Sequence, residues 1–422
     1  MAASVAQPLA GRSWIEQALV YLTAAAAVTT EVSIAASQIL MGMAVIALVA
    51  AHARLRWPPA AWPLSAWAAL TLVSFAAAGY PPAGFAQIKK FYVYLMLFLV
   101  AAAIRSLREI RRVALGWVAA ASLSAAWSLE QFARKYHAAR MQHRDFYTAY
   151  VANRVTGFMS HWMTFSGEMM MALMIVLALL LFAPRTRCQT WLVGGAGALI
   201  AVALLAAETR SMWGGAAVGA AYLFWFKRRW LVLGIPLAIG LVALVNPFEL
   251  RERIVSIVQP HGELESNAHR AVLRRVGWEM IKAHPLVGLG PEQVGPQFGR
   301  YLPADVPRPL PDGYYGHLHN IYFHYAAERG LPALAALLCF FGRALYDFAR
   351  ALRRLPADSA ARWIVHTAIA VIIAFLLGGY FEVNFGDSEV LGMFLAVVGL
   401  GYVAASGGFA ISSGQPRPSA AR

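Results

Sequence analysis

The long apolar runs of this chain constrain its fold more than any other feature. A helix that crosses a bilayer needs roughly 20 mostly apolar residues, and about twelve segments of this kind can be found. They lie near residues 15–31, 34–51, 63–79, 91–104, 113–129, 159–183, 190–208, 212–226, 230–246, 320–342, 363–381 and 389–406. Charged residues make up only 14% of the chain, against about 25% in soluble domains. The sequence therefore predicts an all-α, polytopic integral membrane protein with about 12 transmembrane helices.

The apolar runs divide the chain into four regions. Residues 1–246 are expected to hold transmembrane helices 1–9, and a medium loop near 130–158 interrupts them. Residues 247–319 form a long polar loop, residues 320–406 carry helices 10–12, and residues 407–422 are expected to be a disordered tail.

The long loop contains both regular and irregular stretches. Apolar residues recur every three or four positions over 268–283, which predicts a helix inside the loop. Residues 286–316 are rich in Pro and Gly, which is typical of an irregular segment.

Basic residues are concentrated in alternate short loops, which predicts the orientation. Lys and Arg accumulate on the cytoplasmic side of membrane proteins. The basic residues on this side are Arg12, Arg54, Arg56, Arg105, Arg108, Arg111, Arg112, Arg185, Arg187, Lys227, Arg228, Arg229, Arg343, Arg350, Arg353, Arg354, Arg362, Arg417 and Arg422. Both termini are thus expected to be cytoplasmic. The net charge of +15 then reflects topology and contact with anionic lipid, and it predicts no nucleic-acid partner.

The remaining basic residues lie on the opposite face, where short loops usually avoid them. Lys89, Lys90, Arg154, Arg210 and Arg270 belong to this set. Guanidinium and ammonium groups together suit a phosphate or diphosphate, so we expect them to form an anion site. The alternative is that they anchor the protein at the membrane surface or pair with nearby acids.

One histidine in the long loop is the first choice for a general base. His319 directly precedes an apolar segment, and an imidazole accepts a proton near neutral pH. Asn320 could orient it or cap the next helix, and His317 and Glu328 are supporting candidates, although Glu328 lies about two turns away. The two histidines could also be a metal pair or surface groups. No carboxylate is close to them in the sequence, so no metal site is predicted.

Several familiar chemistries find no motif in the chain. An Asp-x-Asp handle for nucleotide sugars, a phosphate-binding loop and a serine-hydrolase elbow are all missing from the sequence. Two cysteines, Cys188 and Cys339, predict neither a disulfide framework nor a metal cluster. A donor that carries its own leaving group, such as a lipid-linked diphosphate, fits both the apolar segments and the basic set.

An ordered set of short motifs resembles the O-antigen ligase/polymerase superfamily of bacterial cell envelopes. The motifs are 208–211, Arg270, 278–290, 319–322 and 328–330. The resemblance covers the second half of the chain, and the layout of the apolar segments agrees with it.

The resemblance implies a polyprenol-dependent glycosyltransferase of the bacterial inner membrane, with its active site facing the periplasm. It implies transfer of O-antigen from undecaprenyl diphosphate to a sugar of the lipid A–core, without metal or other cofactor and with inversion at the anomeric carbon. On this sequence, His319 would take the acceptor proton, and Arg210 would hold the diphosphate and offset its charge as it leaves. Arg154, Lys90 and Lys89 would hold the diphosphate, with Arg270 as a further substrate contact.

Three other functions stay open. A polymerase that extends the glycan on its lipid carrier shares the superfamily motifs, and a protein oligosaccharyltransferase is a further relative. A transporter of lipid-linked glycan is an alternative from another class. It would be favoured by charged residues inside many membrane segments, whereas most of the segments here lack them.

Overall fold

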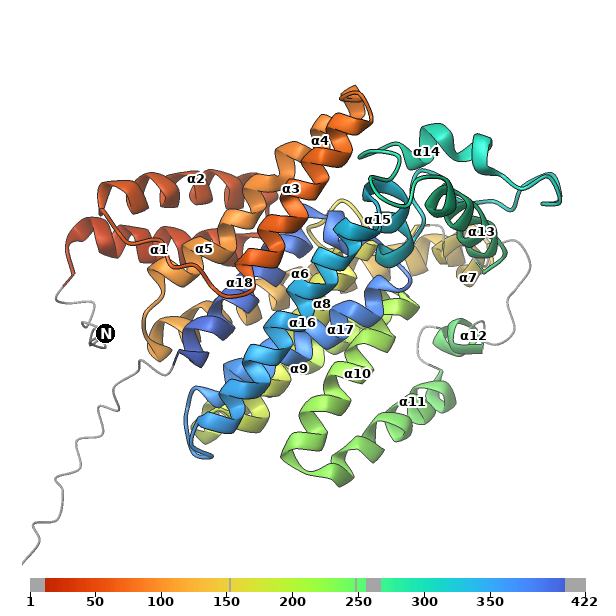
Figure 1. Cartoon of the computed structure of the whole chain (residues 1–422). Coiled ribbons are helices and arrows are strands. Elements are labelled where there is room, and N and C mark those ends of the chain that lie inside the picture. The colour runs from red at the N-terminus through yellow and green to blue at the C-terminus, as the bar shows by residue number, and fades with distance from the viewer. Residues whose placement is uncertain (1–11, 152, 247–248, 256–266, 407–422) are drawn as a thin grey trace, which may run out of the picture.

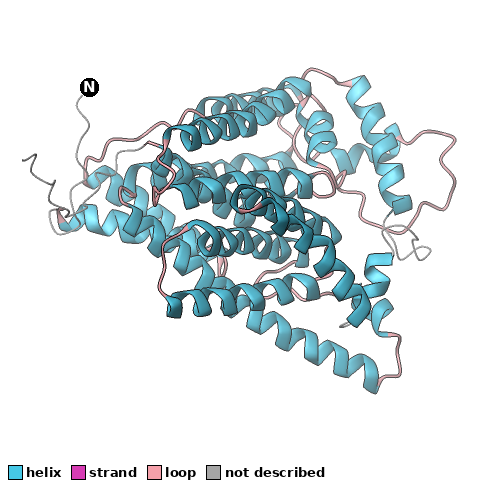
Figure 2. Cartoon of the chain, turned by 90° about the horizontal axis from the view of Figure 1, so that it is seen from below, coloured by secondary structure: helices cyan, strands magenta, loops and turns pink. Residues whose placement is uncertain are grey.

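A computed structural model of the chain describes residues 12–151, 153–246, 249–255 and 267–406. All regular elements in these ranges are helices (Figures 1 and 2). The predicted all-α class is therefore confirmed for the described part of the chain. The tail predicted for 407–422 lies outside it.

The first half of the chain builds one side of the bundle. A hairpin of α1 (Trp14–Thr29) and α2 (Ile34–Ala50) packs beside α5 (Leu95–Ala103). The remaining helices of this half are α3 (Ala61–Ala77), η2 (Pro82–Gly84), α4 (Phe85–Lys89), η3 (Lys90–Tyr94), α6 (Leu107–Met141) and α7 (Phe146–Val151). The Ser106 hydroxyl accepts a hydrogen bond from the backbone of Glu109, and the Glu109 carboxylate accepts one from the backbone of Ser106. This capping box fixes the start of α6.

The part of the chain after α7 supplies the centre of the bundle and a cap at one end. Its membrane-type helices are α8 (Trp162–Phe182), α9 (Arg187–Ala206), α10 (Arg210–Lys227), η4 (Arg229–Leu233), α11 (Gly234–Val245), α16 (Leu331–Arg354), α17 (Arg362–Gly379) and α18 (Ser388–Ala405). The shorter elements are α12 (Leu250–Val255), α13 (Asn267–Ala283), α14 (Val294–Gln297), η7 (Phe298–Tyr301), α15 (Ile321–Arg329) and η8 (Asn384–Gly386). Most residues of α8, α17 and α18 are buried, so these three helices form the core.

Within the described ranges, seven helical segments are long and apolar enough to cross a membrane. They are Pro82–Ala103, α6, α8, α9, α16, α17 and α18, and shorter apolar helices cover Ile34–Ala50, Ala61–Ala77 and Arg229–Val245. Each predicted apolar segment overlaps a helix, but a count of twelve spans is not confirmed. Large apolar side chains on outer helices, among them Ile46, Trp191 and Leu244, are exposed, as expected for surfaces that face lipid.

Two predicted boundaries differ from the structure. The single helix expected over 320–342 is broken at Gly330, whose φ of +85° favours glycine, so α15 and α16 are separate helices. The loop expected near 130–158 begins with a helix, because α6 continues without interruption to Met141. The helix predicted for 268–283 is confirmed as α13.

The segment around α13 has an apolar core of its own. Leu273, Val276 and Met280 on α13 pack against Leu318 and the α15 residue Ala327. We call the end of the bundle where α13, α14 and α15 gather the loop end (Figure 1). A cap with its own core can hold polar side chains over the membrane helices in fixed positions.

Candidate active site

His319 is held in place by both of its neighbours. Leu318 is buried against Gly277, where an added Cβ would lie 2.6 Å from a Leu318 methyl group. Asn320 is the N-cap of α15, because its side-chain oxygen accepts hydrogen bonds from the backbone of Tyr322 and Phe323. Between these anchors His319 has a φ of +47°, which is uncommon for a residue other than glycine. The backbone is therefore fixed in an unfavourable conformation that presents the imidazole at the loop end.

The imidazole of His319 faces a carboxylate from a distant part of the chain. Its Nδ1 lies 3.1 Å from both Oε1 and Oε2 of Glu382, in the link between α17 and α18. Both side chains are largely buried, with 12% and 7% exposed. Burial raises the pKa of Glu382, but the hydrogen bond and charge of His319, with smaller contributions from His317 and Arg270, hold it below its usual value of 4.5. An ionised carboxylate only accepts hydrogen bonds, so Nδ1 carries the proton and Nε2 is left as the basic atom.

The Nε2 atom of His319 is buried and has no hydrogen-bond partner among the described residues. Buried polar atoms usually have a partner. This nitrogen can therefore accept a proton from a bound hydroxyl group.

Two more histidines surround His319. The ring of His317 lies 4.1 Å from it and the ring of His269, from α13, lies 5.5 Å from it, centroid to centroid. Burial lowers the pKa of His317 to about 3 and that of His269 to about 4, with His319 as the next contribution in both cases. Both rings are therefore neutral at neutral pH.

Arg154 is a second component of the site. It lies between α7 and α8, is only 9% exposed, and places its guanidinium 5.1 Å from the ring centroid of Trp162. Burial lowers its pKa to about 9, and the charges of Arg253 and Arg210 act in the same direction, whereas Glu208 opposes them. Arg154 is still cationic at neutral pH, and Arg210, the first residue of α10, is near enough to influence it.

His161 connects the arginines with His319. It caps the N-terminus of α8 and its ring stacks on Trp162 at 4.1 Å. Burial lowers its pKa, Glu382 raises it, and Arg154 and His319 lower it. Arg154 and the His319–Glu382 pair therefore act electrostatically on one imidazole from different elements.

The other predicted site residues occupy different surroundings. Arg270, on α13, carries a charge that lowers the pKa values of both Glu382 and His269, so it lies near His319. Lys90 donates a hydrogen bond to the Gly386 carbonyl at 2.7 Å, and Lys89 is exposed.

Glu328 belongs to a separate buried cluster. Its carboxylate lies 3.1 Å from the guanidinium of Arg329 and 3.6 Å from His324, and it accepts a hydrogen bond from the Glu292 backbone at 2.6 Å. These contacts connect α15 to the loop before α14 and do not include His319. The role that the structure favours for Glu328 is therefore to hold the loop.

The segment around Gly288 is more than a turn. The backbone of Leu289 and Gly290 donates hydrogen bonds to the carbonyls of Ala327 and Glu328, at 2.9 and 2.8 Å. Gly288 has a φ of +67°, and an added Cβ would lie 2.4 Å from the Glu328 backbone. The glycines thus let the loop approach the end of α15 closely.

Sequence reasoning missed Glu382, His269 and His161. Glu382 is 63 positions from His319, so the search for a carboxylate close in sequence could not find it. The usable signal was its position in a link between two apolar segments, on the same predicted face as the long loop.

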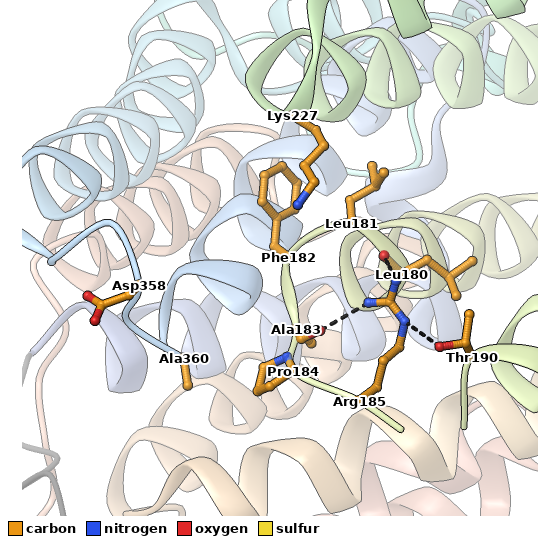
Figure 3. Close-up of a pocket in the computed structure, with 10 residues that line it drawn as sticks. All are labelled: Leu180, Leu181, Phe182, Ala183, Pro184, Arg185, Thr190, Lys227, Asp358 and Ala360. Atoms are coloured by element: carbon orange, nitrogen blue, oxygen red, sulfur yellow. Dashed lines mark hydrogen bonds between the residues drawn. The ribbon is translucent and has the colours of Figure 1, made fainter. Parts of the chain in front are cut away.

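A shallow, open pocket lies elsewhere in the fold (Figure 3). It has a volume of about 520 Å³ and is lined by the C-terminal end of α8 together with Lys227 and Asp358. Arg185 in this pocket donates hydrogen bonds to the carbonyls of Leu179 and Ala183 and to Thr190. Its donors are used within the protein, so this pocket provides little for an anionic ligand. Because α8 has 21 residues, His161 and this pocket are about 30 Å apart.

Residues 195–338 match the family model described as O-antigen ligase. The matched part extends from α9 into α16 and includes Arg210, α13 and His319. No curated protein matches the chain. The family match supports membership of the O-antigen ligase/polymerase superfamily, whose members are glycosyltransferase-like enzymes acting on lipid-linked glycans.

Proposed function

We propose that the protein is an O-antigen ligase. It transfers a glycan from undecaprenyl diphosphate to a sugar hydroxyl of the lipid A–core, with inversion and without a metal cofactor. The observation that carries this proposal is the pair formed by His319 and Glu382, which leaves a buried, unpartnered imidazole nitrogen close to Arg154 and His161.

His319 is the general base of the proposed reaction. The acceptor hydroxyl donates its proton to Nε2 as its oxygen attacks the anomeric carbon. The new glycosidic bond forms on one face of the sugar while the bond to the diphosphate oxygen breaks on the other. Glu382 stabilises the resulting imidazolium through Nδ1, 3.1 Å away. A positioned base of this kind typically contributes about 10²–10⁴-fold to the rate.

Arginine charges stabilise the leaving diphosphate. Arg154 and Arg210 interact electrostatically, and Arg210 is the first residue of α10. The N-terminus of α8 begins at His161, in the same neighbourhood. Helix N-termini and guanidinium groups both favour anions. This arrangement supports a diphosphate near Arg154, with Lys90 and Lys89 farther along the same end of the bundle.

The membrane helices suit a donor with a long apolar tail. Seven segments can span a bilayer, and the outer helices expose large apolar side chains. A polyprenyl chain can therefore lie in the bilayer while its diphosphate reaches the loop end. Basic residues are abundant in the opposite loops, which supports cytoplasmic termini and a periplasmic site in the bacterial inner membrane.

A polymerase shares the superfamily and the same chemistry at the anomeric carbon. The two functions differ in the acceptor: lipid A–core for a ligase, and another carrier-linked glycan for a polymerase. His319→Ala in cells that make long lipopolysaccharide separates them. A ligase defect leaves uncapped lipid A–core and accumulates lipid-linked polymer, whereas a polymerase defect leaves single units attached to the core.

The direct test uses purified protein, lipid-linked glycan and lipid A–core, with and without a chelator. The proposal predicts transfer in both conditions and its loss in His319→Ala. A reaction that requires lipid-linked glycan as the acceptor would replace the ligase function with the polymerase function. Transfer that stops with chelator would contradict metal independence.

A further inference from the structure

Three side chains that bind metals well meet at the loop end. His317, His319 and Glu382 each offer one ligand atom, and these atoms lie within 4.8 Å of one another. Two of the residues belong to the link before α15 and the third to the link between α17 and α18. The cluster therefore depends on the tertiary fold and could not be seen in the local sequence.

A third imidazole adjoins this group. His269 is 3% exposed, and its Nε2 has no hydrogen-bond partner within the described ranges, as is also true of His319 Nε2. The two rings meet edge to face, 5.5 Å apart. Two buried, unpartnered nitrogens in contacting rings are costly, and a bound cation would give both a partner.

We propose that His317, His319 and Glu382, assisted by His269, form a Zn²⁺ site whose occupancy inhibits the enzyme. Imidazole nitrogen and carboxylate oxygen are typical ligands of zinc. Magnesium and calcium prefer all-oxygen ligands, so they fit this cluster poorly. The binding site itself stands on geometry alone, while its inhibitory effect rests on the proposed function of His319.

Small rotations of the side chains would complete the site. Zinc holds these ligands at about 2.0–2.2 Å, which places neighbouring ligand atoms about 3.3 Å apart in a tetrahedron. The cluster must therefore contract from its present separations of up to 4.8 Å. Arg270 acts electrostatically on Glu382 and His269 and so opposes a second cation. Its charge favours reversible rather than permanent occupancy.

Zinc and the acceptor hydroxyl compete for the same groups. A metal ion held by His319 and Glu382 removes both groups from the reaction, because the imidazole can no longer take the acceptor proton and the carboxylate can no longer stabilise an imidazolium. Zinc therefore blocks proton transfer but leaves Arg154 and Arg210 able to hold the donor.

The first experiment measures binding without any substrate. Full-length protein without a histidine tag is titrated with Zn²⁺ against a chromophoric chelator. One site per chain is expected, with affinity reduced about tenfold or more in His317→Gln, Glu382→Gln and His269→Gln, since even outer-shell changes cost about 10–100-fold. The control His137→Gln/His143→Gln changes two exposed histidines and should bind zinc like the wild type. Circular dichroism and size-exclusion chromatography check that each variant is folded.

Arg270→Gln should change the affinity for zinc in the opposite direction. Removing its charge should tighten zinc binding, whereas general disruption of the loop end would weaken it. Equal affinity in the wild type and all three ligand variants would overturn the site.

The second experiment measures glycan transfer. Zinc should inhibit the wild type, a chelator should restore activity, and the residual activity of His269→Gln should require about tenfold more zinc for the same inhibition. Zinc bound at the cluster without any effect on transfer would overturn the inhibitory role. A protein that binds zinc there but never transfers glycan would contradict the proposed function and leave the binding site supported.

Discussion

The Nδ1 atom of His319 lies 3.1 Å from both carboxylate oxygens of Glu382. This contact fixes the tautomer, because the carboxylate holds the proton on Nδ1 and leaves Nε2 free to act as a base. Two loops that are far apart in the sequence thus bring the proposed base and its carboxylate partner together. The pair also makes Glu382, which lies outside the sequence motifs, a residue to test by substitution.

Glu382→Gln tests the role of this contact in catalysis. The amide can donate a hydrogen bond to Nδ1, which favours the tautomer with the proton on Nε2 and removes the base. We expect the turnover number to fall by about 10²–10⁴-fold, the range of a general base, while the KM for the lipid-linked donor changes little. Steady-state transfer kinetics measure both. A large increase in donor KM with normal turnover would assign Glu382 to donor binding instead.

Arg154→Gln tests the diphosphate site. Hydrogen bonds to charged groups contribute about 1.5–3 kcal/mol, so the donor KM should rise about 10–100-fold, and Arg154→Lys should recover part of the loss by retaining the charge. Arg134→Gln is the matched control, since Arg134 is exposed and pairs with Glu130 on α6. An equal effect in Arg134→Gln would show that general surface charge attracts the donor.

Glu208 gives the donor site a pH dependence. Burial raises its pKa to about 7, although Arg253 and Arg154 lower it. Below pH 7 the carboxyl is neutral and the arginine charges are uncompensated. Above pH 7 the carboxylate forms and repels the diphosphate. The donor KM should therefore rise between pH 6 and pH 8, by about fivefold for about 1 kcal/mol of repulsion.

Glu208→Gln removes this titration. Its donor KM should stay near the low-pH value of the wild type across the same range. An unchanged slope in the variant would assign the pH dependence to another group.

Gly288→Ala tests how the loop end is built. The glycine has a φ of +67°, and a methyl group there would meet the Glu328 backbone at 2.4 Å. A strained backbone position costs about 1–3 kcal/mol, so thermal unfolding in detergent should shift to lower temperature. Gly299→Ala is the control, because a Cβ there meets nothing within 4 Å. Equal stability of both variants would contradict the close packing of this loop on α15.

Local patterns were enough to predict the helices of the described part of the chain. Apolar runs predict membrane helices because lipid provides no hydrogen bonds to the backbone, and periodicity located α13. The pairing of His319 with Glu382 depends on how α15, α17 and α18 pack, which no local pattern contains. The division of the 320–342 segment was missed although Gly330 and Pro332 mark it in the sequence. Gly330 has a positive φ, and Pro332 lies in the first turn of α16.

The same limit applies to the charged candidates. Lys90 and Arg154 were grouped because Lys and Arg are unusual in short outward loops, and Glu328 was a supporting candidate about two turns from His319. The structure gives Glu328 a pairing with Arg329 and gives Lys90 a contact with the Gly386 carbonyl. The sequence can show that a charged residue lies where burial is costly, but the packing of the helices determines which group it pairs with.

The most direct test is glycan transfer by purified His319→Ala with undecaprenyl diphosphate-linked glycan and lipid A–core. The account predicts that donor binding stays at the wild-type level and that the rate falls by about 10²–10⁴-fold. A variant that transfers glycan at the wild-type rate would contradict the assignment of His319 as the base.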